Sequence, residues 1–184
     1  MRIRTTIVVC IALTAATAAA ATRPIQQLVL QPGDLPGWTV PAHVKPQGPA
    51  AFAKEHDKTT KAILATGFVS GATAFLKGPG NGLSIAVRYH TPEQARREAL
   101  RLYRSNLNTD PGIKGAPIPV KGIPGSHAIR MTGKHEGKAV LGYEIVFAHN
   151  TDMMELFIIG LAKDIDQAAV LKAARTLWQR SLAS

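Results

Sequence analysis

The only cysteine of this chain, Cys10, lies in an apolar segment near the N-terminus. Arginines precede the segment, and small residues occupy positions 19–21 at its end. This order predicts a bacterial secretory signal peptide over residues 1–21, cleaved near Ala21. The mature chain would then contain no cysteine, so it is disulfide-free and packing alone must stabilise the fold outside the cytoplasm.

Two alternatives to a cleaved signal peptide start from the same segment. An uncleaved membrane anchor needs roughly 20 apolar residues, whereas the run here is about 15 residues long. A lipoprotein would carry its lipid on Cys10, but Val9 stands where a small residue is expected. We therefore expect a secreted, extracytoplasmic protein with no transmembrane helix in the mature chain.

Charge narrows the choice of partners. The chain has 22 Lys and Arg residues against 12 Asp and Glu, and the signal peptide contains two of the basic residues and none of the acidic ones. The mature net charge of +8 favours contact with anionic surfaces, although it also simply favours solubility. Nucleic-acid binding requires aromatic platforms among basic residues. Because only 5% of the residues are aromatic, no nucleic acid is expected as a partner.

Prolines divide the mature chain into two parts. Residues 22–48 contain five of them, at a spacing that neither a helix nor a central strand tolerates. We interpret this stretch as a proline-rich N-terminal arm, followed by an α+β domain over residues 49–184. Within the arm, residues 34–38 predict a tight turn whose Leu35 and Trp38 pack into the core.

Capping signals and apolar spacing predict three helices. The first covers residues 49–65 and ends before Gly67. The second begins after Thr91, where threonine, proline and glutamine form a capping box. A second capping box over residues 164–167 begins the terminal helix, and Arg180 in its last turn favours the negative end of the helix dipole.

The strand patterns follow a regular order between these helices. Apolar alternation or apolar runs predict strands at residues 68–76, 83–89, 126–132, 139–148 and 153–161. The last strand is apolar on both faces apart from Glu155, so we place it centrally. Residues 108–125 are rich in glycine and proline and predict a long irregular loop. The order indicates an α+β fold with a single, largely antiparallel five-stranded sheet covered by helices.

No motif assigns a catalytic or metal site. The glycine-rich residues 78–82 lead into a strand and predict a hairpin turn, not a phosphate loop. Ser126 beside His127 lacks the Gly-x-Ser-x-Gly context of a nucleophile elbow. The six histidines show no i, i+4 pair, and the scattered acidic residues suggest no carboxylate pair for acid and base catalysis. We predict no catalytic residue, no metal and no cofactor.

Four arginines on the helix after Thr91 form the most distinctive polar pattern. Arg97, Arg101 and Arg104 are spaced to share one helix face, with Arg96 beside them. Arginine forks suit phosphate and carboxylate oxygens, so these residues are a speculative anion-binding site. Glutamates three or four residues before Arg97 and Arg101 favour the alternative of an ordinary solvated face.

Three segments carry a resemblance to a known group of proteins. They are the turn at residues 34–38, the stretch 67–95 that leads into a Thr-Pro-Glu-Gln-Ala helix start, and the Ile-Pro-Gly junction at residues 123–125. Together they resemble small secreted proteins and lipoproteins of high-GC Gram-positive bacteria, and the order of elements is similar to the PsbP-like α/β/α sandwich. The resemblance implies a binding or assembly module, and no catalytic residue of the group maps onto this chain.

These observations predict an exported, non-catalytic binding or cell-envelope-associated module. Its partner would be an anionic envelope polymer or another exported protein. The alternative is a secreted hydrolase whose site is assembled from distant segments, for instance under the loop at residues 108–125. The two differ in one observable, because a hydrolase needs a nucleophile and a base within hydrogen-bond reach in a concave site.

Overall fold

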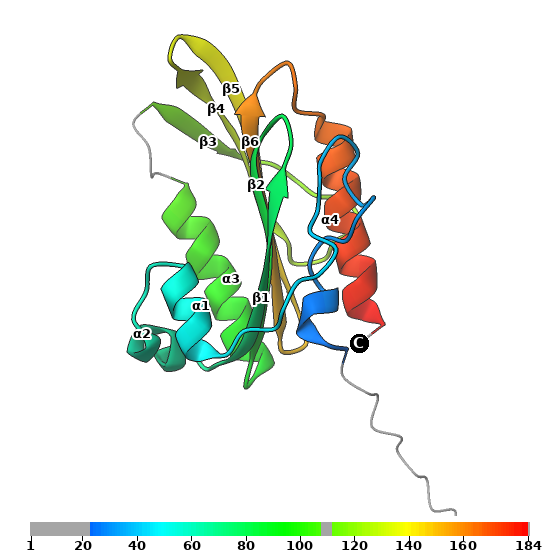
Figure 1. The fold of residues 1–184 in the computed structure, drawn as a ribbon. Coiled ribbons are helices and arrows are strands. Elements are labelled where there is room, and N and C mark those ends of the chain that lie inside the picture. The colour runs from blue at the N-terminus through cyan, green and yellow to red at the C-terminus, as the bar shows by residue number, and fades with distance from the viewer. Residues whose placement is uncertain (1–22, 108–111, 184) are drawn as a thin grey trace, which may run out of the picture.

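A computed structural model describes residues 23–107 and 112–183. The predicted signal peptide, its cleavage point and Cys10 lie outside the described residues, and so do residues 108–111 of the predicted loop. The remaining chain forms one antiparallel sheet with helices on both faces (Figure 1). This arrangement confirms the α+β class predicted from the sequence, while the PsbP-like comparison stays a prediction.

The sheet has the strand order β1-β2-β6-β5-β4-β3, and every neighbouring pair is antiparallel. The strands are β1 (Phe68–Lys77), β2 (Gly80–Tyr89), β3 (Ile113–Pro117), β4 (His127–His135), β5 (Lys138–His149) and β6 (Asp152–Leu161). The predicted central position of the last strand is confirmed, because β6 lies between β2 and β5. Its residues therefore contribute to the packing on both faces of the sheet.

The prediction of five strands is wrong, since β3 adds a sixth within the segment predicted as a loop. β3 is short and pairs only with β4, at the edge of the sheet. An edge position tolerates the proline and the glycine that hide this strand from pattern analysis. Gly115 leaves little room there for a larger residue, because a Cβ atom would lie 3.0 Å from the Cγ2 atom of Ile129.

Tight hairpins connect the other strands. Residues 78 and 79 join β1 to β2, which confirms the hairpin prediction for the glycine-rich segment. β4 continues to His135, beyond residue 132 where the sequence predicts the strand to end. Glu136 and Gly137 then turn the chain with φ angles of 50° and 76°, the left-handed pair that suits a two-residue hairpin.

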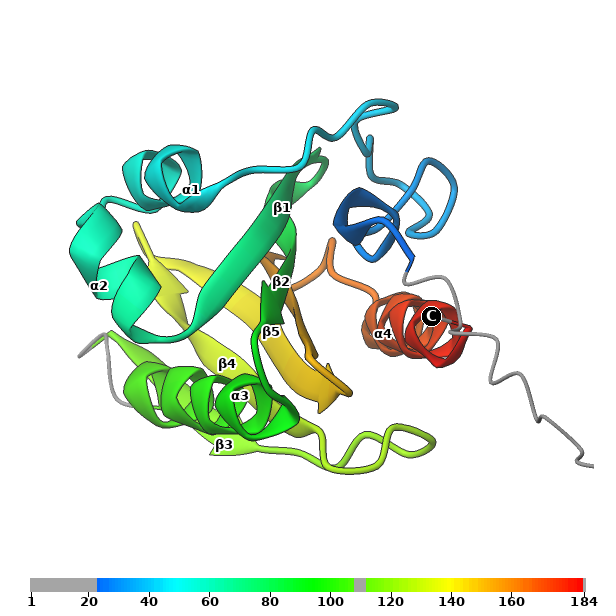
Figure 2. The ribbon, with the colours of Figure 1, turned by 90° about the horizontal axis from the view of Figure 1, so that it is seen from below.

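Helices cover the two faces unequally. Figure 2 shows three helices on one face, namely α1 (Pro49–Glu55), α2 (Thr60–Ala65) and α3 (Pro92–Asn106). The other face carries α4 (Gln167–Leu182) and the N-terminal arm with its short 3-10 helix η1 (Ile25–Gln27). The larger hydrophobic core is under α4 and the smaller one is under α1 to α3. The side with three helices is thus the less completely packed side.

Two predicted helix boundaries need correction. The single helix expected over residues 49–65 is interrupted, because Asp57 adopts a φ of 50° and Thr59 caps a new helix by accepting a hydrogen bond from the Ala62 amide. The terminal helix begins two residues later than the capping-box pattern predicted, since Asp166 is the N-cap. The capping box at Thr91 is confirmed in both of its hydrogen bonds.

The N-terminal arm packs tightly against the α4 face. Leu28, Val29 and Leu30 are fully buried, and the Leu30 amide donates a hydrogen bond to Ser84 Oγ in the middle of β2. The predicted packing of the turn at residues 34–38 is confirmed, since Leu35 is buried and Trp38 packs against the same core.

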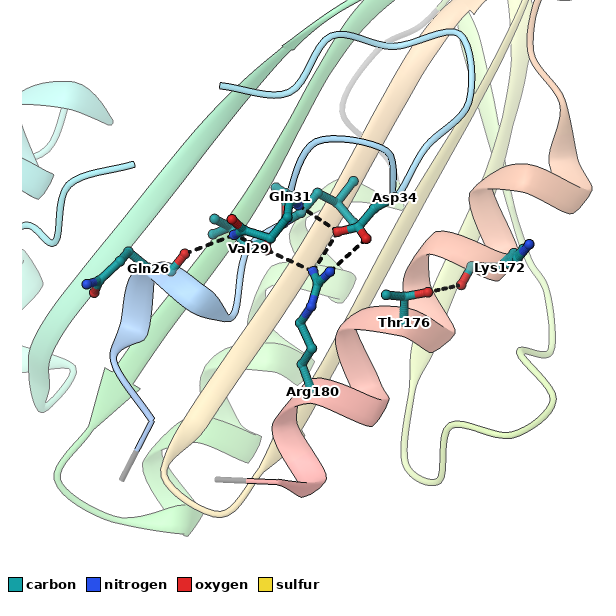
Figure 3. Close-up of polar contacts among 9 residues, drawn as sticks. Gln26, Val29, Gln31, Asp34, Lys172, Thr176 and Arg180 are labelled. Carbon is teal, nitrogen blue, oxygen red and sulfur yellow. Dashed lines mark hydrogen bonds and ion pairs between the residues drawn. The ribbon is translucent and has the colours of Figure 1, made fainter. Parts of the chain in front are cut away.

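An ion pair joins the arm to the terminal helix. Both terminal nitrogens of Arg180 donate to the carboxylate of Asp34, at 2.6 and 2.7 Å, and Arg180 Nη1 also reaches the carbonyl oxygen of Val29 (Figure 3). Asp34 in turn accepts a hydrogen bond from the Gln31 amide, which holds the loop closed. Arg180 is thus a tertiary contact and not only a helix-dipole residue.

Replacing this arginine should loosen the arm. We expect Arg180→Met to lower the free energy of unfolding by about 2 kcal/mol, because a bidentate, half-buried pair is lost and Asp34 keeps an unpaired charge. Chemical denaturation of the mature protein measures the effect. Lys172→Met, on an exposed position of the same helix, is the matched control. Equal stability of the two variants would contradict a stabilising role for the pair.

Candidate functional site

A groove of about 450 Å³ lies on the face of the sheet covered by α1, α2 and α3. α1 and α2 pack against β1 on one side of it, whereas α3 packs across β5 and β6 on the other. The middle strands β2 and β6 are therefore left as a floor between two helical walls. The walls include Phe52, His56, Ile63, Glu98, Arg101 and Leu102.

The floor of the groove is mostly apolar. Alternate residues of β2 point into it, namely Leu83, Ile85, Val87 and Tyr89. The sequence predicted this alternation and one buried face of the strand. That face was expected to pack against the core, whereas in the structure it lines the groove. Met153 of β6 continues the apolar surface beside Val87.

Glu155 is the one acidic residue of the groove floor. It is 8% exposed, and its register partners on either side are Ile85 of β2 and Val146 of β5. Its carboxyl has no hydrogen bond to any described residue. Burial raises the pKa of Glu155 to about 8, with a further contribution from Glu144 and an opposing one from Lys58. The carboxyl is therefore mainly protonated at neutral pH.

A second buried carboxyl, Glu144, lies diagonally across the sheet from Glu155. It is on the same face of β5, two residues before Val146, and is 1% exposed. Asn106 Nδ2 donates to its Oε1 atom at 2.8 Å, while Oε2 has no partner among the described residues. Burial raises the pKa of Glu144 to about 7, and the hydrogen bond from Asn106 opposes this rise. Glu144 does not line the groove.

The sequence marks Glu155 as the one polar residue of an apolar strand but does not reveal its pairing with Glu144, since the acidic residues are scattered along the chain. Each glutamate interrupts a strongly apolar strand, which is the signal that could have singled both out. Their proximity, however, depends on the register of β5 against β6, which the sequence alone does not give. The pair therefore appears only once the strands are aligned.

Glu98 and Arg101 of α3 form the polar side of the groove. Arg101 Nε donates to Glu98 Oε2 at 2.6 Å, and Arg97 Nε is 3.8 Å from the other carboxylate oxygen. Glu98 is buried, contrary to the expectation of a solvated residue. Beside it, burial and then the charge of Glu98 raise the pKa of Tyr89, so its hydroxyl stays a hydrogen-bond donor.

The four candidate anion-binding arginines have different surroundings. Arg96 is exposed and lies 3.4 Å from Glu93, whereas Arg97 and Arg101 approach Glu98. Arg104 is exposed in the last turn of α3. Arg101 is the only one of the four that lines the groove, and Arg96 borders a second hollow near Trp178. Anion binding by this set stays a prediction.

One threonine and one histidine meet the distance criterion for a nucleophile and a base. His56 Nε2 lies 3.0 Å from Thr73 Oγ1. The nearest carboxylate, Glu55, lies 3.6 Å from the same nitrogen. In a catalytic triad the carboxylate binds the other ring nitrogen and orients the histidine. Burial lowers the pKa of His56, and the contact joins α1 to β1.

The remaining sequence motifs have structural roles. Ser126 Oγ donates to the carbonyl oxygen of Ile123, and the ring of His127 stacks on Tyr103 at 5.0 Å. Over residues 23–107 and 112–183, no group of three or more His, Cys, Asp or Glu residues is placed to hold a metal ion. In the same residues, no helix has the length and apolar character needed to cross a membrane.

Fold and groove together define a six-stranded antiparallel α+β sandwich with a hollow on one face. No family model matches the chain, and no curated protein matches its sequence. The fold is similar to the extracellular domain of PknH from Mycobacterium tuberculosis, with a TM-score of 0.59 and 11% identity over 87% of this chain and 95% of that one. An uncharacterised protein from Mycobacterium smegmatis aligns with a TM-score of 0.46 and 9% identity, over 81% of this chain and 90% of its own.

The buried glutamates predict a pH dependence of stability. Both are protonated in the folded protein at pH values where the unfolded chain releases the proton, so the free energy of unfolding falls as pH rises from about 5 to about 8. Glu155→Gln removes one of the two contributions. At pH 8 we expect the free energy of unfolding of this variant to exceed that of the parent by about 2 kcal/mol. Chemical denaturation measures this difference.

The exposed Glu93 supplies the control for this experiment. Glu93→Gln should follow the parent across this pH range, because the Glu93 side chain is exposed in the folded protein. If Glu155→Gln and the parent also lose stability in parallel from pH 5 to pH 8, Glu155 is not protonated in the folded protein.

Proposed function

We propose that this chain is an exported, non-catalytic binding module that holds a small apolar or amphipathic molecule in the groove between α1–α2 and α3. The observation that carries the proposal is a hollow of about 450 Å³ with an apolar floor and a few polar groups at one side. Small-molecule sites have this composition and this size. The opposite face of the sheet carries the larger hydrophobic core, which side chains fill under α4.

Export is supported by the predicted signal peptide and by the fold. A basic leader, an apolar segment and small residues at 19–21 are typical of secretion. The extracellular domain of PknH has a similar fold, and we extend its location outside the cytoplasm to this chain as part of the proposal. The resemblance to PsbP-like proteins and the mature charge of +8 favour a binding module associated with the cell envelope.

Binding is favoured over hydrolysis by the arrangement of polar groups. The contact between His56 and Thr73 is the closest approach to a nucleophile and a base, but Thr73 does not line the groove. The glutamates do not supply a free acid and base pair either, because Glu144 lies outside the groove and Glu98, which lines it with Glu155, is already paired with Arg101. A binding function uses the hollow without requiring these groups to react.

Filling the groove tests the proposal. The mature protein should raise the fluorescence of N-phenylnaphthylamine, an uncharged apolar probe. Ala62 is exposed and lines the groove, so Ala62→Trp should occupy the space without disturbing the core. We expect this variant to bind the probe roughly tenfold more weakly or worse.

Leu64 provides the matched control on the same helix. It is 53% exposed and does not line the groove, so Leu64→Trp adds an indole of the same size to α2 away from the hollow. This variant should bind the probe as the parent does. Equal binding by all three proteins would show that the probe does not use the groove, and no binding by the parent would reject the proposed function.

A further inference from the structure

The free polar groups of the groove are mainly hydrogen-bond donors. Lys58 and Arg101 bring positive charge to its sides, and the Tyr89 hydroxyl donates from the floor. Of the described residues that line the groove, only Glu98 and Glu155 are acidic, and the two carboxylate oxygens of Glu98 already face Arg101 and Arg97. As long as Glu155 stays neutral, the groove therefore offers an ammonium ion no unpaired carboxylate, while Lys58 and Arg101 repel it.

Glu155 adds a donor to the floor of the groove. Its carboxyl lies among apolar neighbours and lines the groove, with no hydrogen-bond partner among the described residues. A protonated carboxyl donates one O–H and needs an acceptor when it is shielded from water. An acceptor oxygen on a bound molecule would satisfy it.

An apolar surface leads away from Glu155 along the floor. Leu83 lines the groove, and its register partners are Phe75 of β1 and Phe157 of β6. Phe75 is 51% exposed and Phe157 is partly exposed, although both are large apolar side chains on the same face as Glu155. In Figure 1 this end of the β1–β2 hairpin extends beyond α1 and α2, which cover only the other end. An extended hydrocarbon chain would cover these residues.

From these contacts we infer that the ligand is an acyl compound, whose hydrocarbon chain covers Leu83, Phe75 and Phe157 and whose carbonyl or carboxylate oxygen accepts a hydrogen bond from Glu155. This inference rests on the proposed function, since it names the chemistry of the molecule held in the same groove. A free fatty acid and an acyl ester share the required oxygen, and the experiment separates them.

The arrangement makes binding depend on pH. The groups that face or surround Glu155 are Glu144 on β5, Lys58 between α1 and α2, His56 on α1, Tyr89 on β2, and Glu98 with Arg101 on α3. Between about pH 6.5 and about pH 9, Glu155 and Glu144 lose their protons. The groove then loses a donor and gains negative charge, so an anionic acyl group binds less tightly.

Displacement of N-phenylnaphthylamine by three ten-carbon compounds tests the inference on the mature protein. Decanoate carries a carboxylate, monodecanoylglycerol a neutral ester, and decylammonium a cation. We expect decanoate to bind about tenfold more tightly at about pH 6.5 than at about pH 9, and decylammonium to bind most weakly of the three at the lower pH. If the ester binds as tightly as decanoate at the lower pH, the carbonyl oxygen is the recognised group. If the ester binds more weakly than decanoate, the carboxylate is the recognised group.

Two substitutions assign the effect to Glu155. Glu155→Gln keeps an N–H donor but cannot ionise, so decanoate should bind with a much smaller pH dependence. Glu155→Leu removes the donor and should lower decanoate affinity about tenfold at about pH 6.5. Both variants remove a buried ionisable group, so thermal unfolding should confirm that they are folded.

The outcomes separate this inference from the proposed function. Tighter binding of decylammonium, growing as pH rises, would overturn the acyl assignment in favour of a cationic ligand. Probe binding without displacement by any of the three compounds would also overturn it and leave the groove as a binding site. Absence of probe binding by the parent protein would reject both proposals together.

Discussion

Burial of β6 on both faces is the constraint on which the rest of this fold depends. Met154, Leu156 and Ile158 point toward α4, while Met153 and Glu155 point toward the groove. Because side chains of a strand alternate, one segment contributes to both cores at once. The arm, α4 and the three helices of the opposite face are placed by the need to cover this strand and its neighbours.

Helices cover the two faces of the sheet differently, and this difference leaves the groove on one of them. On one face, α4 and the arm fill the surface, and the pair of Arg180 with Asp34 holds them together. On the other, α1 and α2 lie over one edge and α3 over the opposite side. The interruption at Asp57 keeps α1 and α2 short and next to β1, while α3 packs mainly against β5 and β6. The floor of β2 and β6 stays open to a ligand.

The placement of charge follows from the same geometry. Glutamates that lie under the helices are removed from water, which raises the pKa values of Glu144 and Glu155 and turns one of them into a donor within the groove. On α3, the exposed Glu93 and the buried Glu98 each pair with an arginine of the same helix instead. A net positive chain thereby presents a groove whose free groups suit oxygen acceptors.

Local signals in the sequence determined the α+β class, the capped start of α3 at Thr91, the hairpin turns and the central position of β6, because each depends on residues within one turn or one strand. The sixth strand, the division of the first helix and the groove were decided only by the tertiary structure. Glu144 and Glu155 meet through strand register, and Arg180 reaches Asp34 across 146 residues of sequence. A single sequence carries no signal for contacts at that separation, since they arise from packing of whole elements.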